Sequence, residues 1–313
     1  MQRILAVIPL YNKEQTIERA IKAVNSQTQS LDLLVVNDGS TDGSNTILEN
    51  YKSNTFQVLT QKNAGVSAAR NAGITYAIEN DYTHVAFLDA DDYWKPDHIK
   101  NISLLQASFP IAQVLATGYK ILQFSKKPKK AVHTDLTSLD AQLLDNYFEY
   151  NYLNTILTSS NCCFDVRAFE KIGLFNTAFT HGEDTDLFIR AGARCNIAFE
   201  PRSSVVIDRT SSNRSATTSI HKRKLLDLDA YEAISQTVPG LKKYLDLNRF
   251  SLSLAYRLEH DIKNAAVYKQ KLDSHNLSKK QNKLLEMSTT QLKALKRTQK
   301  ILGKLGWYLR TGN

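Results

Sequence analysis

Three carboxylates follow a short apolar run in the first third of the chain. Residues 84–88 predict a strand, and Asp89, Asp91 and Asp92 come directly after it. Side chains alternate between the two faces of an extended segment, so we expect Asp89 and Asp91 to point the same way. Two neighbouring carboxylates repel each other, and a divalent cation such as Mg²⁺ or Mn²⁺ would relieve that repulsion. The alternative interpretation is a solvated turn in which an Asp caps the next helix.

Other residues that could bind a ligand also stand just after predicted strands. Apolar runs predict strands at 4–10, 31–36 and 56–60, each followed by helical spacing, at 14–24, 44–51 and 67–79. Strands that alternate with helices predict a parallel sheet covered on both faces, in which ligands bind beyond the carboxyl ends of the strands. We therefore expect Tyr11, Asp38, Lys62 and Asp89 to lie on one rim of the sheet.

The middle third of the chain is less regular. A strand or hairpin is predicted over 113–124, a helix over 143–153 and a strand-like segment over 158–164. Two further helices are predicted over 168–172 and 184–191. The 42% hydrophobic content supports a packed core throughout.

Composition also bears on the compartment. The N-terminus reads as a first strand and not as a signal peptide, and no apolar run approaches the ~20 residues needed to cross a bilayer. Three cysteines without metal-ligand spacing favour a reducing environment. We therefore expect a cytoplasmic protein.

Positive charge is concentrated in the last third of the chain. Residues 1–215 contain 21 Lys and Arg against 23 Asp and Glu, a net charge of −2, whereas residues 216–313 contain 19 against 8, a net charge of +11. Helix-forming residues dominate this basic part. Its positive charge suggests that it has an anionic neighbour.

Six short motifs lie along the predicted rim in a fixed order. They are Ile8-Pro9-Leu10-Tyr11-Asn12, Val36-Asn37-Asp38-Gly39-Ser40-Thr41-Asp42, Lys62-Asn63-Ala64-Gly65, Ala69-Arg70-Asn71-Ala72-Gly73, Leu88-Asp89-Ala90-Asp91-Asp92 and Gly182-Glu183-Asp184. Their order and spacing resemble those of the family 2 inverting glycosyltransferases of the GT-A fold, over roughly residues 3–210. The resemblance implies transfer of a hexosyl or N-acetylhexosaminyl group from a nucleotide-sugar, most often a UDP-sugar, to an acceptor hydroxyl.

The resemblance also implies an architecture. We expect an α/β fold of GT-A type, with a mixed, mainly parallel sheet flanked by helices and a helical C-terminal extension. The catalytic domain would occupy residues 1–215, with a nucleotide-binding half over 1–100 and an acceptor half over 101–215. Residues 216–313 would form the basic helical C-terminal region.

For the nucleotide, the resemblance implies a binding set of Pro9, Tyr11, Glu14, Asp38, Lys62, Arg70 and Asp89. Asp38 would accept the imide N–H of uracil, and Tyr11 would offer a ring for stacking. Lys62 and Arg70 would contact base carbonyl or phosphate oxygens. The residues themselves also allow plainer roles, such as a turn for Asp38, a core-edge aromatic for Tyr11 and capping support for Glu14.

For the reaction, the resemblance implies that Asp184 is the general base and that Asp91 ligates Mn²⁺ or Mg²⁺. Asp89 would contact the ribose or, through water, the metal, and Asp92 would start the next helix. Glu183 could share contacts with the acceptor or favour the helix N-terminus. His221 follows a Ser/Thr/Arg-rich segment over 209–219 that could fold over the diphosphate, and this histidine could contact the diphosphate or add a metal ligand.

The basic tail leaves several partners open. Leucines from Leu285 to Leu309, with Trp307 and Tyr308, suit a helix lying on an anionic membrane surface, and equally a packed bundle or a seam between two copies. We expect a glycan or lipid-linked acceptor, peripheral association with the inner face of the cell membrane, and no nucleic-acid partner.

Two other functions share parts of this pattern. A nucleotidyltransferase uses a similar architecture and carboxylate pair, but usually carries a Gly-rich basic loop after its first strand, which Pro9-Leu10-Tyr11-Asn12 is not. A non-catalytic nucleotide-sugar-binding scaffold would not need Asp89, Asp91 and Asp184 together.

Overall fold

The computed structural model describes residues 2–51, 56–123, 127–131, 133, 140–152, 154–211 and 218–304. Its strands are β1 (Ile4–Leu10), β2 (Asp32–Asn37), β3 (Gln57–Thr60), β4 (His84–Phe87), β5 (Tyr93–Trp94), β6 (Val114–Leu122), β7 (Lys129–Lys130), β8 (Gln142–Leu143), β9 (Cys162–Asp165) and β10 (Ile197–Asp208). Its helices are α1 (Ile17–Asn25), α2 (Ser44–Asn50), α3 (Val66–Glu79), α4 (His98–Ser108), α5 (Ala168–Ile172), α6 (Glu183–Arg194), α7 (Glu232–Ser235), α8 (Leu241–Leu258), α9 (Ile262–Lys271), α10 (Lys279–Glu286) and α11 (Thr289–Lys304). Two 3₁₀ turns also matter for the site, η1 (Tyr147–Asn151) and η2 (Ser159–Asn161).

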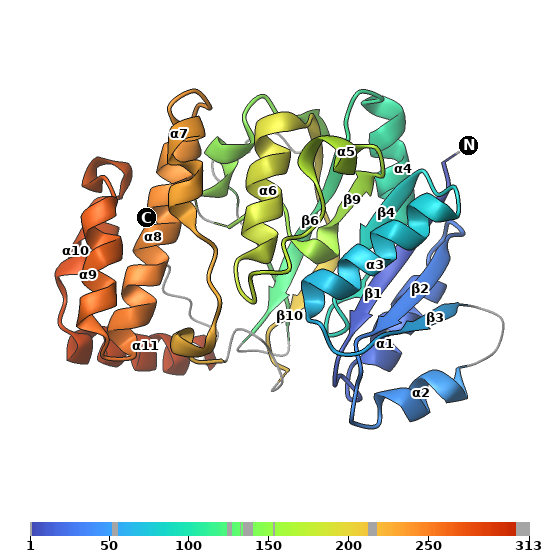
Figure 1. Ribbon diagram of the computed structural model, residues 1–313, viewed down its shortest axis with the longest axis horizontal. Coiled ribbons are helices and arrows are strands. Elements are labelled where there is room, and N and C mark those ends of the chain that lie inside the picture. The colour runs from blue at the N-terminus through green and yellow to red at the C-terminus, as the bar shows by residue number, and fades with distance from the viewer. Residues whose placement is uncertain are drawn as a thin grey trace.

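One sheet runs through the described part of the chain, in the order β3-β2-β1-β4-β9-β6-β10-β5. Strands β3, β2, β1 and β4 run parallel to one another, and β6 is parallel to β10. Strand β9 is antiparallel to both β4 and β6 and separates the two parallel groups. The expected mixed, mainly parallel α/β sheet flanked by helices is confirmed (Figure 1).

Alternate residues of the strands bury two separate cores, one on each face of the sheet. On β1, Ile4, Ala6 and Ile8 join the core that also contains residues of α1 and α4, whereas Leu5 and Val7 join the core that contains α3 and α6. Figure 1 shows α3, α5 and α6 in front of the sheet. Because both faces are covered, the open ends of the strands are where a ligand can reach the domain.

Helix α3 lies very close to β1. A Cβ atom at Gly73 would lie 2.4 Å from Cγ1 of Val7, so no larger residue fits without a shift of the helix. Ala69 and Ala77 are small buried residues one turn away on either side. This stripe of small residues sets the depth of α3 and, with it, the position of Arg70.

Two predicted elements differ from the structure. The helix predicted over 143–153 is wrong: this segment forms β8 and then η1. Asn146 accepts a hydrogen bond from the backbone N–H of Phe148, and the buried rings of Tyr147 and Phe148 favour a tight turn over a regular helix. The helix predicted from residue 14 begins only at Ile17, because residues 13–16 form a turn.

The C-terminal region packs onto the domain and also has a core of its own. Leu241, Tyr244 and Leu245 of α8 belong to the core that covers the α6 face of the sheet. Further along, α8, α10 and α11 enclose a third cluster, which consists of Phe250, Leu277, Leu284, Leu285 and Leu292. In Figure 1 these helices lie beside α6, at the opposite end of the molecule from β2 and β3.

The single final helix suggested by the leucine spacing is wrong. Leu285 lies in α10, and α11 begins at Thr289. Leu285 and Leu292 are buried against α8, which confirms the bundle interpretation for these two leucines. Trp307, Tyr308 and Leu309 lie outside the described residues, and membrane association and pairing of two copies stay predictions. Within the described chain, every helix is too short or too polar to span a membrane.

Candidate functional site

A pocket of about 550 Å³ opens at the carboxyl ends of β1, β2 and β4. Its lining contains most of the residues that the sequence placed on the rim: Pro9, Tyr11, Asp38, Arg70, Asp89, Asp91, Glu183 and Asp184. Glu14, Lys62 and His221 are not among the lining residues. The expected gathering of distant motifs at one edge of the sheet is therefore found for eight of the eleven candidate residues.

Asp38 is fixed inside this pocket. It is 2% exposed, and its carboxylate accepts hydrogen bonds from the backbone N–H groups of Ala64 and Gly65, both at 2.8 Å, and from the side chain of Gln61 at 2.7 Å. Gly65 has a φ of 90°, which suits the sharp entry into α3. A carboxylate has about four acceptor positions, so three bonds leave capacity for one further donor from a ligand. Tyr11 stands at the mouth with 45% of its surface exposed.

Glu14 lies outside the pocket and joins two loops. Its carboxylate accepts a hydrogen bond from the backbone N–H of Gly43 at 2.7 Å, while Asp42 accepts one from the backbone N–H of Glu14 at 3.1 Å. These bonds hold the loop after β1 against the loop after β2. In the structure Glu14 supports the pocket wall, and it does not open a helix as the sequence suggested.

Arg70 lies between two carboxylates at the centre of the pocket. The guanidinium is 2% exposed and donates to Asp89 and to Asp184, each at 2.8 Å, with Glu183 at 3.9 Å. It also lies over the ring of Phe175, 5.1 Å from the centroid. The sequence suggested ligand contacts or a plain surface position for Arg70; the structure shows that Arg70 is buried and ties Asp89 to Asp184.

Asp184 is in the first turn of α6, after Gly182, whose φ of 90° lets the chain turn sharply into the helix. A Cβ atom at Gly182 would come within 3.0 Å of Leu226, so this turn also needs the missing side chain. The hydroxyl of Ser159 donates a hydrogen bond to Asp184 at 2.9 Å. Burial raises the pKa of Asp184 to about 6, against the lowering effect of Arg70, and the charges of Glu183 and Asp89 add to the rise. This carboxylate can therefore take up a proton near neutral pH.

The three carboxylates after β4 have separate surroundings. Asp89 pairs with Arg70, and Asp91 accepts a hydrogen bond from the ammonium group of Lys13 at 2.8 Å. Asp92 is 4% exposed and accepts bonds from the hydroxyl of Ser160 and from the backbone N–H of Asp208. Burial raises the pKa of Asp92 well above its usual range. The predicted role of Asp92 in starting the next helix is wrong, because α4 begins at His98, directly after Asp97, and Asp92 instead joins this turn to β10.

The metal prediction can be compared with these contacts. No group of three or more His, Cys, Asp or Glu side chains in the described ranges is arranged to hold a metal ion. Mg²⁺, however, is usually held by one or two carboxylates together with substrate phosphates, and Asp91 and Asp89 both face the pocket. The oxygen ligands therefore fit such an ion in type, and Lys13 supplies a positive charge at the same position.

His221 is placed elsewhere. Its ring packs edge-on against Tyr256, at 5.7 Å between centroids, and its Nδ1 is 3.7 Å from Asp261. It lines neither this pocket nor a larger pocket beside α8. The structure gives no support to the predicted contact of His221 with a diphosphate or a metal. Residues 212–217 of the predicted covering loop lie outside the described residues.

Several residues in and around the pocket escaped detection in the sequence. Lys13 directly follows the first motif but was not predicted to line the pocket, and Ser159, Ser160 and Asp208 lie outside the six motifs. Asp208 pairs with Arg19 at 2.8 Å, and it reaches the site because β10 brings its end beside β5. A strand over 197–208 was not predicted, since Pro201 and the polar residues after it interrupt the apolar pattern.

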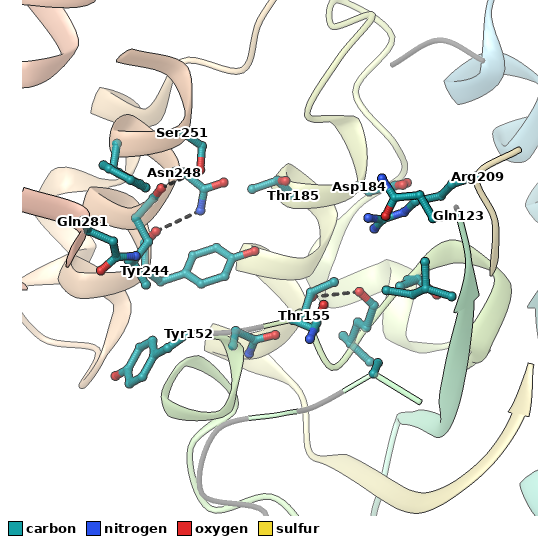
Figure 2. Close-up of a pocket in the computed structure, with 18 of the residues that line it drawn as sticks. Gln123, Tyr152, Thr155, Asp184, Thr185, Arg209, Tyr244, Asn248, Ser251 and Gln281 are labelled. Atoms are coloured by element: carbon teal, nitrogen blue, oxygen red, sulfur yellow. Dashed lines mark hydrogen bonds between the residues drawn. The ribbon is translucent and has the colours of Figure 1, made fainter. Parts of the chain in front are cut away.

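Asp184 also lines a second, larger pocket of about 1120 Å³, whose lining residues come from 121–209 and from the C-terminal helices. Figure 2 shows this pocket: Tyr244 and Asn248 reach into it from α8, and Thr185 and Asp184 come from α6. Thr155 lies on the domain side, with Gln123 and Arg209 next to Asp184 in this view. The carboxylate thus belongs to the wall between two pockets.

Comparisons with known proteins agree with this architecture. The model of the family described as glycosyl transferase family 2 matches residues 5–173, which is more than half of the chain. A glycosyltransferase named GlyA from Streptococcus pneumoniae is 34% identical over 103 residues, which are 32% of this chain and 14% of that protein. The minor teichoic acid biosynthesis protein GgaA of Bacillus subtilis is 31% identical over 103 residues, 31% of this chain and 23% of that protein.

A solved structure is similar over nearly the whole chain. The crystal structure of S. aureus TarS 1-349 in complex with UDP-GlcNAc superposes with a TM-score of 0.66, covering 99% of this chain and 93% of that one, at 17% sequence identity. At this identity the likeness concerns the fold. The chain aligns with only 14% to 28% of the length of the first curated relatives. Because the family model matches more than half of its residues, the chain belongs to glycosyl transferase family 2.

Proposed function

We propose that the protein is an inverting glycosyltransferase that moves a sugar from a UDP-sugar to an acceptor hydroxyl during synthesis of a cell-surface glycan. The observation that carries this proposal is the position of Asp184, a carboxylate with a pKa raised to about 6 in the wall between two pockets. The UDP-GlcNAc complex of the TarS neighbour and the name of GgaA support the donor and the glycan.

The smaller pocket is the donor site in this proposal. The free acceptor position of Asp38 would receive the imide N–H of uracil, and Tyr11 would stack on the base. Asp89 would bind the ribose, held in place by Arg70. Lys62 is exposed and outside the lining, so its contact with the donor stays a prediction.

The reaction follows from the two-sided position of Asp184. The carboxylate removes the proton of the acceptor hydroxyl, and the oxygen forms a bond to the anomeric carbon of the donor. The bond between this carbon and the phosphate oxygen breaks on the opposite face, and UDP leaves with the bonding electrons, so the configuration inverts. General-base catalysis of this kind contributes about 10²–10⁴-fold.

In this proposal, the residues around Asp91 stabilise the negative charge of the leaving UDP. Lys13 is the ammonium group nearest this carboxylate, 2.8 Å away, and lines the donor pocket. Asp91 directly, and Asp89 through water, would hold Mg²⁺ or Mn²⁺, which when bound supplies positive charge to the departing diphosphate. We further propose that residues 1–215 carry the donor site and that residues 216–313 complete the acceptor side.

The test is release of nucleotide. The full chain is incubated with Mn²⁺ and a panel of UDP-, GDP-, dTDP- and CMP-sugars, and free nucleotide is measured with and without candidate hydroxylated acceptors. We expect UDP release from one UDP-sugar, stimulated by an acceptor. Pyrophosphate release from a nucleoside triphosphate and a sugar phosphate, with no turnover of any nucleotide-sugar, would instead identify a nucleotidyltransferase and overturn the proposal.

A further inference from the structure

The larger pocket is strongly basic. Six of its lining residues are Lys or Arg: Lys129, Lys130, Arg209, Lys296, Arg297 and Lys300. Asp184 is the one acidic side chain among the lining residues of the described chain. This excess contrasts with the donor pocket, whose lining contains Asp38, Asp89, Asp91, Asp92, Glu183, Asp184 and Asp208. The two pockets that share Asp184 therefore carry opposite charge.

The basic groups come from both walls of this pocket. Lys129 and Lys130 form β7, and Arg209 directly follows β10, so these three belong to the catalytic domain. The other three lie on α11, at positions i, i+1 and i+4, close to one face of the helix. In the part of the chain that the structure describes, Lys296, Arg297 and Lys300 form no ion pair.

The rest of the lining suits a polyhydroxylated chain. The lining contains the ring of Tyr152, which Lys243 covers on one face at 3.7 Å from the centroid, and the amide group of Asn248. Tyr244 and Gln281 also line the pocket, but both are mostly buried. Aromatic faces pack against the apolar side of sugar rings, and amides can pair with hydroxyl groups as donor and acceptor. A volume of about 1120 Å³ exceeds the space that one hexose needs.

We propose that this pocket is the acceptor site and that the acceptor is a hydroxylated polymer with repeated negative charges, a polyol-phosphate chain or an acidic polysaccharide. The inference rests on the proposed function, because Asp184 must be the base. Negative groups on the chain would contact the cations of β7, Arg209 and α11, while one of its hydroxyl groups reaches Asp184. The field of the basic walls would also attract the chain before it binds.

A flat anionic membrane surface fits these residues less well. Lys296, Arg297 and Lys300 are exposed on α11, but they line a pocket that they share with the buried residues Asn151 and Leu157, and a bilayer surface cannot reach these inner lining residues. A flexible polymer chain can. The basic side of α11 therefore serves the reaction itself in this proposal.

The experiment compares two triple variants with the same change of charge and the same spacing. In the first, Lys296→Gln, Arg297→Gln and Lys300→Gln alter the pocket. In the second, Lys279→Gln, Lys280→Gln and Lys283→Gln alter α10, where the side chains are exposed and do not line the pocket. Dissociation constants are measured by titration calorimetry for poly(glycerol phosphate), polygalacturonate and uncharged dextran.

We expect the wild-type protein to bind one anionic polymer and not dextran. The pocket variant should bind that polymer about tenfold more weakly, and the α10 variant should stay within about twofold of wild type. Which of the two polymers binds distinguishes phosphodiester from carboxylate groups. Equal weakening in both variants, tighter binding of dextran, or equally tight and competing binding of a single-stranded oligonucleotide would overturn the proposal.

A second measurement distinguishes a wrong acceptor class from a wrong proposed function. UDP release to water from the UDP-sugar, with no acceptor present, is measured for all three proteins and should be equal. Unchanged UDP release without any binding of an anionic polymer would overturn the acceptor class alone. Polymer binding without turnover of any nucleotide-sugar would instead contradict the proposed glycosyltransferase activity, on which the inference rests.

Discussion

Asp89 and Asp184 share the guanidinium of Arg70, with each carboxylate 2.8 Å from one of its terminal nitrogens. Arg70 is 114 residues from Asp184 in sequence and 19 from Asp89. One buried cation therefore joins the proposed ribose contact to the proposed base. We therefore expect occupation of the donor site and protonation of the base to be coupled through this group.

Replacement of Asp184 by Asn tests the base. We expect transfer to fall by about 10²–10⁴-fold, because the amide cannot accept the hydroxyl proton, while the dissociation constant for UDP changes little. Initial rates and UDP titration check this. Asp97→Asn, at an exposed position outside both pockets, is the matched control. Full activity in the Asp184 variant would remove this residue from the mechanism.

The raised pKa of Asp184 predicts an acid limit to activity. A general base works only in its deprotonated form, so kcat/KM should rise with pH through about 6, with a slope of one proton, and level off above that value. Rates measured from pH 4.5 to 8.5 in buffers of constant ionic strength check this. A flat profile across this range would contradict the assignment.

Arg70 should set the position of that limit. Because the guanidinium lowers the pKa of Asp184, Arg70→Met should move the acid limb to higher pH, and the remaining rate should be at least about tenfold lower. Arg70→Lys keeps the charge but loses the forked geometry, so we expect a lower kcat with a smaller shift of the limb. Arg167→Gln changes an arginine whose side chain is 80% exposed and should leave the profile where it is. An identical profile in Arg70→Met would show that the pair does not tune the base.

The rim of the site was predictable because its residues follow strands. Strand ends place Tyr11, Asp38 and Asp89 by local sequence alone, and Gly182 marks the turn that presents Asp184. The parallel β1–β4 half was predicted for the same reason, since its alternation of strands and helices is regular.

The supporting contacts were not predictable, because they arise from pairs that are far apart in sequence. Ser160 reaches Asp92 over 68 residues, and Lys13 reaches Asp91 over 78. The strand β10 escaped notice because it carries Pro201 and a bulge between Glu200 and Ser203, where it departs from regular pairing with β6. The second pocket depends on how α8 and α11 pack, and residue spacing alone does not show this.

Substitution of Asp91 should affect activity, whereas substitution of the adjacent Asp92 should affect stability. Asp91→Asn should abolish transfer stimulated by Mn²⁺ and leave the melting temperature near that of wild type. Asp92→Ala should lower stability by about 1–3 kcal/mol, because it leaves the hydroxyl of Ser160 and the backbone N–H of Asp208 without their buried acceptor. Thermal unfolding and metal-titrated rates distinguish the two. Full Mn²⁺-stimulated transfer in Asp91→Asn would contradict the metal prediction.

Gly73→Ala should disturb the site from a distance. The new Cβ atom would meet Cγ1 of Val7 at 2.4 Å, so α3 must move away from β1 and carry Arg70 with it. We expect a loss of about 1–3 kcal/mol in the free energy of unfolding and a lower kcat. Val7→Ala removes the two methyl groups that clash, so the double variant should be more stable than the sum of the two single effects. Urea unfolding of the four proteins gives this interaction energy, and an additive cycle would show that α3 does not rest on Val7.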